Sequence, residues 1–134
     1  MRAVSGATAD SARRLLEHRT GHPIISLYLD LDPERFATPP ARAAQIRSLI
    51  DQAARELDSA GDALSHEDKV TLRADLQRID DYLNSREPPF QGAGALGVFC
   101  SSRDDLFEVV PLPRPTPDQV VIGRSPHVEP LIAM

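Results

Sequence analysis

The residues best placed for chemistry in this sequence are two carboxylates, Asp30 and Asp32, at the end of the apolar run "IISLYL". Carboxylate oxygens are ligands that Mg²⁺ prefers, so an Asp-x-Asp pair at a strand end can hold a metal for phosphoryl transfer. Two carboxylates also occur simply where a buried strand meets water. The residues that surround the pair decide between these two interpretations.

Phosphotransferases of the haloacid dehalogenase type carry such a pair, and their motif continues with Thr or Val and then an apolar residue. Here Pro33 and Glu34 follow the pair, and the chain has no glycine-rich phosphate loop and no repeated strand-helix-strand order. We therefore expect Asp30 and Asp32 to be solvated carboxylates at a strand end, with no catalytic metal. A magnesium-dependent phosphotransferase stays open as an alternative.

The other nucleophilic and metal-binding residue types are scattered along the chain. No serine lies in a G-x-S-x-G setting. The single cysteine, Cys100, lies in the apolar run "GVFCSS", where we expect a small core residue rather than a disulfide or a multi-cysteine zinc site. The four histidines, His18, His22, His66 and His127, are scattered, and we expect surface or capping roles for them rather than metal ligation. We predict a protein that is not an enzyme and needs no cofactor.

The bulk composition predicts one globular domain over residues 1–134. The chain has 134 residues, of which 41% are hydrophobic and 26% are charged, which suits a single ordinary core. No apolar run approaches the roughly 18 residues that a membrane span needs. The first residues lack the apolar core of a signal peptide, so we expect a cytoplasmic protein with no membrane partner.

The net charge of −5 opposes non-specific binding to nucleic acid, which depends on basic side chains that neutralise phosphates. Residues 1–60 hold eight Arg against eight Asp and Glu, whereas residues 61–134 hold seven Lys and Arg against twelve acids. Any contact with RNA must therefore come from a local basic patch.

Hydrophobic periodicity predicts two long helices in the middle of the chain. After a short helix over 11–19 and an apolar strand over 23–31, a helix is expected from 41 to about 60 and a second from a capping box at "SHED" to about 86. Their apolar stripes are Ile46, Leu49, Ile50, Ala53 and Leu57 in the first, and Leu72, Leu76, Ile79 and Leu83 in the second. So short a turn between them indicates an antiparallel hairpin.

The last third of the sequence changes to a strand pattern. Three short β-rich runs, 94–102, 106–113 and 119–125, predict an antiparallel meander, and the apolar tail "PHVEPLIAM" completes no element. The fold class is therefore an α/β (α+β) sandwich: a mixed, mostly antiparallel sheet of about four strands, with the long helical hairpin packed on it.

Several strings resemble the N-terminal domain of class-one release factors of the eukaryotic and archaeal type, and more closely their bacterial release-factor-like relatives. The strings are "ISLYLDLDP", "GALGVFCSS", "FEVVPLPRP" and "PHVEPL", with the hairpin between the first two. The resemblance covers about residues 22–134. It implies that residues 1–134 are the first domain of a longer protein and that the end of the first strand is a turn without metal chemistry.

The stop-codon motifs of the family do not transfer to this chain. Family members carry Asn-Ile-Lys-Ser at the hairpin tip; here "QIRS" (45–48) imitates it but lies inside the first helix, and the tip at about 58–65 is small and acidic. A Tyr-x-Cys-x-x-x-Phe motif belongs near 120–126, where none of these residues occurs. The Gly-Gly-Gln loop for peptide release belongs to the family's second domain.

The resemblance implies a ribosome-associated binding module that occupies the ribosomal A site in hibernation or rescue, without stop-codon reading. Its partners would be ribosomal RNA and proteins and the C-terminal domains of its own full-length chain. The best basic residues for ribosome contact are Arg35, Arg42, Arg47 and Arg55. A solvated helix face accounts for them equally well, and a protein-interaction domain unrelated to translation is the other alternative.

Overall fold

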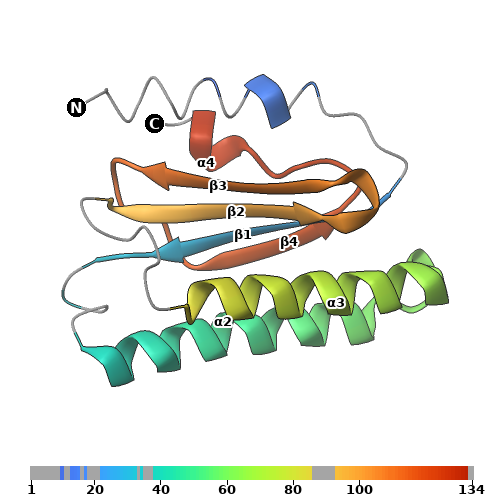
Figure 1. Cartoon of the computed structure of the whole chain (residues 1–134), viewed down its shortest axis with the longest axis horizontal. Helices are drawn as coiled ribbons and strands as arrows, with labels where there is room; N and C mark the ends of the chain where they lie inside the picture. The colour runs from blue at the N-terminus through green and yellow to red at the C-terminus, as the bar shows by residue number, and fades with distance from the viewer. Residues whose placement is uncertain are drawn as a thin grey trace.

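The computed structural model describes residues 10, 13–15, 17, 22–32, 34, 38–85 and 93–132. The fold is α+β, with a four-stranded antiparallel sheet and a long helical hairpin on one face (Figure 1). In chain order the elements are β1 (Ile24–Asp30), α2 (Pro39–Ser59), α3 (His66–Leu83), β2 (Ala95–Ser101), β3 (Leu106–Leu112), β4 (Gln119–Gly123) and α4 (Glu129–Ile132).

The sheet has the strand order β3-β2-β1-β4, so β1 lies inside it and pairs on both sides. Leu27 lies opposite Val98 of β2 and also opposite Val120 of β4. The expected meander is therefore correct for β2 and β3 and wrong for β4, which pairs with β1 instead of β3. The segment after β3 carries the chain across the sheet end, where it passes Gly94 so closely that an added Cβ would lie 2.5 Å from the carbonyl carbon of Arg114.

The hairpin forms as its sequence predicts. The Thr38 side chain accepts the N–H of Ala41 at 3.2 Å, and two prolines occupy the first turn of α2. The Ser65 side chain accepts the N–H of Asp68 at 3.0 Å and so caps α3. Between the helices, Gly61 adopts a φ of +58°, which glycine tolerates without strain.

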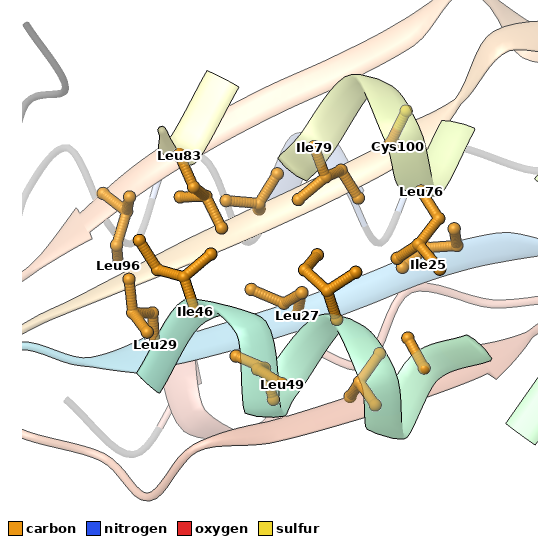
Figure 2. Packing of buried hydrophobic residues seen from close by; sticks show 14 of the residues in the cluster. Ile25, Leu27, Leu29, Ile46, Leu49, Leu76, Ile79, Leu83, Leu96 and Cys100 are labelled. Carbon is orange, nitrogen blue, oxygen red and sulfur yellow. The ribbon is translucent and has the colours of Figure 1, made fainter. Parts of the chain in front are cut away.

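The hairpin packs against one face of the sheet, and this face holds the larger core. Residues Ile25, Leu27 and Leu29 of β1 point into it, and the two helical stripes meet them (Figure 2). Every member of both predicted stripes is buried; Leu76, for example, is 6% exposed. The predicted register of the hairpin is therefore confirmed.

The opposite face of the sheet is covered by segments from the two ends of the chain. Leu15 packs there, although most of the helix predicted over 11–19 lies outside the described residues. The apolar tail was expected to complete no element, but it forms α4. Leu131 of α4 and Val128 just before the helix are buried in the same cluster as Tyr28. That expectation was wrong because a four-residue helix is too short to show a helical period.

Candidate functional site

Asp30 and Asp32 cap consecutive turns at the end of β1. Asp30 Oδ1 accepts the N–H of Asp32 at 3.0 Å, and Asp32 Oδ1 accepts the N–H of Glu34 at 3.0 Å. Asp30 is only 8% exposed, so the expectation that both carboxylates are solvated was wrong for this residue. The spacing of the pair is explained by side-chain hydrogen bonds to the backbone two residues on, which end the strand.

A polar cluster on the hairpin face fixes the same strand end from the other side. Asp118 Oδ1 accepts the Asp30 N–H at 2.7 Å and a hydrogen bond from Gln45 Nε2 at 3.0 Å. Gln45 Nε2 also donates to the Asp30 carbonyl at 2.6 Å. Asp118 thereby extends the β1–β4 ladder by one bond and ties the first turns of α2 to both strands.

Side-chain alternation separates the carboxylates of Asp30 and Asp118. Asp30 follows Ser26 and Tyr28 toward the face covered by the chain ends, whereas Asp118 is in phase with Val120 on the hairpin face. The two groups therefore do not converge on one metal position. Within the described residues, no three His, Cys, Asp or Glu side chains form a group that could hold a metal ion.

Of the four predicted contact arginines, the three that the structure describes point to different sides of α2. Arg35 lies outside the described residues. Arg42, Arg47 and Arg55 are all exposed on α2, but at 3.6 residues per turn Arg42 and Arg47 point about 140° apart and Arg47 and Arg55 about 80° apart. Arg47 also lies 4.0 Å from Asp51 in an exposed i,i+4 pair.

The charge of the hairpin as a whole is negative. Residues 39–83 hold six Lys and Arg against nine Asp and Glu, which gives −3. The stretch from Glu56 to Asp68 holds five acids and no Lys or Arg. Contacts to an RNA backbone must therefore avoid the hairpin tip.

An ion-pair cluster that no sequence pattern predicts connects the β2–β3 turn to α3. Arg103 Nη1 donates to Asp68 Oδ1 at 2.6 Å, and Arg103 Nη2 lies 3.5 Å from Glu67. On the same turn, Asp104 lies 3.0 Å from His22 Nδ1 and accepts the Ser101 hydroxyl hydrogen at 3.0 Å. Arg103 and Asp68 lie 35 positions apart in the chain, and His22 and Asp104 lie 82 positions apart. No local sequence motif therefore marks this cluster.

A cleft of about 320 Å³ lies between the hairpin tip and the adjoining ends of β1 and β4, and we name it the tip cleft. Its lining residues are Pro23, Glu56, Ser59, Ala60, Ala63, Leu64, Ile122, Gly123 and Arg124. Burial raises the pKa of the Glu56 carboxyl, and a hydrogen bond from Gln52 opposes the rise. A mostly apolar hollow with a few polar groups at its rim is the usual form of a ligand site.

The string "QIRS" does not present a recognition motif. Gln45 is 9% exposed and Ile46 is 3% exposed, so only Arg47 and Ser48 of this string face outward. The position near 120–126 belongs to β4 and the segment after it. Sequence reasoning missed the hydrogen bond between the buried Gln45 and the half-buried Asp118, because a single glutamine beside a helical stripe resembles any polar neighbour.

Comparison with known proteins supports the fold and goes no further. No family model matches the chain, and no curated protein matches it. A solved structure titled "Archaeal protein" superposes with a TM-score of 0.64 over 97% of this chain, at 16% sequence identity. The chain spans 35% of the length of that neighbour. Within the described part of the chain, no helix is long and apolar enough to cross a membrane.

Proposed function

We propose that this chain is a ribosome-associated binding module of a release-factor-like protein, which occupies the A site in ribosome hibernation or rescue without reading stop codons. The observation that carries the proposal is that the sequence segments resembling release factors coincide with strands of the structure. "ISLYLDLDP" spans β1 and its capped exit, "GALGVFCSS" spans β2, and "FEVVPLPRP" spans β3 and the crossing that follows. The long hairpin is inserted between the first two, in the order the family requires.

The geometry of the hairpin supports a role without codon reading. The tip, where the family places its first codon-reading motif, is here a turn around Gly61 flanked by acidic residues. Base recognition by hydrogen bonds and stacking needs donors and aromatic or planar groups, and the stretch from Asp58 to Ser65 supplies neither Arg, Lys nor an aromatic ring. The neighbour of similar fold is much longer than this chain, which fits a first domain followed by others.

The Asp-x-Asp pair takes no part in this proposal. Its carboxylate oxygens are used as acceptors for backbone N–H groups at the end of β1. The magnesium-dependent phosphotransferase gains no support from the described geometry, because Asp30 and Asp32 bind backbone N–H groups and no group of three His, Cys, Asp or Glu side chains forms around them in the described residues.

The proposal is tested by sedimentation of the full-length protein, tagged at its own locus, from growing and from nutrient-starved cells. We expect it to comigrate with ribosomes in starved cells and to be displaced by an A-site-bound aminoacyl-tRNA. On purified ribosomes, binding should be equal with a stop codon and with a sense codon in the A site. If the wild-type protein stays at the top of the gradient in both conditions, the proposal fails.

Two double variants locate the contact because they change the same total charge at different places. Arg35→Glu with Arg42→Glu changes one residue that precedes α2 in the sequence and one in its first turns, and Arg47→Glu with Arg55→Glu changes two exposed residues farther along α2. We expect the first pair to weaken comigration and to make the remaining binding less dependent on salt than that of wild type, because fewer phosphates are neutralised. We expect the second pair to match wild type. If both double variants comigrate with ribosomes as well as wild type does, these arginines are not in the contact. The proposed function is then still decided by the wild-type result.

A further inference from the structure

The two edges of the sheet differ in how they are protected. The edge strand β3 contains Pro111, which has no N–H, and Glu108, which Arg14 holds at 2.6 Å. The edge strand β4, "QVVIG", has neither proline nor charge, and in the described residues no backbone hydrogen bond joins its outer side. An edge strand without proline or charge is a template for another strand unless something covers it.

The tip cleft lies beside the end of this open edge and on the hairpin face of the sheet. Ile122 pairs with Ile25, points toward the hairpin and lines the cleft. Ala60, Ala63 and Leu64 of the hairpin tip form the opposite wall. A strand added to β4 would direct alternate side chains to this face, so one of them would enter the cleft.

Glu56 gives the cleft its charge preference. Its side chain is half-buried in the cleft wall, and burial raises the pKa of this carboxyl. In the described structure no ion pair compensates it, although Arg124 lines the same cleft. Three other acids of the stretch from Glu56 to Asp68 form ion pairs within the fold: Asp58 with Arg73, and Glu67 and Asp68 with the single Arg103.

We infer that the β4 edge and the tip cleft bind an extended, basic segment of a partner protein, which adds to β4 as an antiparallel strand. One apolar side chain of the segment fills the cleft, and a Lys or Arg two positions away, on the same face, pairs with Glu56. This inference goes beyond the proposed function, since it needs no ribosome.

A second copy of the chain fits this position less well. Two β4 strands paired antiparallel about a two-fold axis would bring the basic end of one strand to the beginning of the other, away from Glu56. The acidic hairpin also opposes RNA as the occupant.

The test starts from a phage-displayed library of random peptides selected on the immobilised full-length chain. We expect enriched peptides to place Lys or Arg two residues from a large apolar residue. A fluorescent synthetic peptide of the selected sequence then gives the Kd, and amide chemical shifts map where it binds. Shifts concentrated in β4 and in residues 59–64 support the inference; no enrichment, or shifts elsewhere, would overturn it.

Matched variants separate the cleft from general electrostatics. Glu56→Lys and Asp51→Lys change the charge equally, but Asp51 is exposed on α2 and does not line the cleft. Glu56→Lys should weaken peptide binding by about tenfold or more, whereas Asp51→Lys should change it less than about twofold. Ala63→Phe, at an exposed turn position, should block the cleft and weaken binding without unfolding the protein.

Equal effects of the two charge variants would show that the cleft is not the site. Shifts of the β4 amides that depend on protein concentration without peptide would show that a second copy occupies the edge, and would overturn the inference as well.

Discussion

The two faces of the sheet are covered in physically different ways. On the hairpin face, α2 and α3 lay two continuous apolar stripes across β1, β2 and β4 (Figure 2). On the other face the cover is short: Leu15 near the start of the chain and α4 at its end. Regular helices cover a sheet by periodicity alone, whereas short segments need particular anchors to stay in place.

Those anchors are hydrogen bonds to β1. The Tyr28 hydroxyl donates to the His127 carbonyl, and the His127 N–H donates to Ser26 Oγ at 2.9 Å. Tyr28 itself is fully buried, edge-on to Phe99 at 5.8 Å between ring centroids. The second face is thus held by a few directed contacts, and it should open more readily than the hairpin face.

The largest expected difference comes from truncating one leucine on each face. Leu76→Ala on α3 should lower the free energy of unfolding by about 2–5 kcal/mol, because the packed helices cannot close the cavity. Leu131→Ala on α4 should cost about 1–2 kcal/mol, because a four-residue helix can shift or detach. Urea denaturation of both variants measures the two costs, and a larger loss for Leu131→Ala would reverse the ranking of the faces.

Alkaline pH probes one buried group on each face. Burial raises the pKa of the Tyr28 hydroxyl on the second face, and it raises the pKa of the Cys100 thiol on the hairpin face from 9.0 to about 12. Both groups stay neutral in the folded protein while the unfolded chain ionises. Their stabilisation is therefore complete below about pH 9 and is lost as the pH rises through the folded values.

The urea midpoint followed from pH 8 to pH 11 should fall, and Tyr28→Phe and Cys100→Ala should each flatten the fall. The thiol of the folded protein should also resist modification by a disulfide reagent at pH 8 as long as the fold is intact. A midpoint that stays constant over this range, or a slope unchanged in both variants, would contradict the assignment.

The smallest effect is a difference in local opening. Amide hydrogens of β1 and of the middle of α2 and α3 should exchange only on global unfolding. The amide of Leu131, bonded to the Val128 carbonyl at 2.9 Å, should exchange faster by local opening of α4. Hydrogen exchange followed by NMR measures both rates, and equal protection of α4 and β1 would show that the second face is as firmly held as the first.

The hairpin and the existence of the four strands followed from local signals. Thr38, the two prolines and Ser65 mark the helix starts, and the buried stripes follow a helical period over many residues. The strands are short apolar runs bounded by turn residues, so their presence was predictable. Each of these signals depends on residues only a few positions apart, so the sequence pattern predicts it directly.

The partner of β4 did not follow from the sequence. Both β3 and β1 offer an edge of apolar residues, and the choice of β1 depends on the crossing past Gly94 and on Asp118 meeting Asp30 and Gln45. The burial of Asp30 has the same origin, because the cover of its face comes from segments far away in the chain. The different directions of Arg42, Arg47 and Arg55 around α2 could have been predicted from the helical period alone.

Interactions between neighbouring residues account for the two capped helices, their apolar stripes, the turn chemistry of Asp30 and Asp32, and the acidic hairpin tip. Contacts between distant segments leave the outer side of β4 without a backbone partner among the described residues, form the tip cleft beside it, and place Glu56 there half-buried with no ion pair in the described structure. These features join β1, β4 and the hairpin tip, and their free energies depend on which distant residues meet. The hydrophobic period of one segment does not indicate which distant residues will contact it.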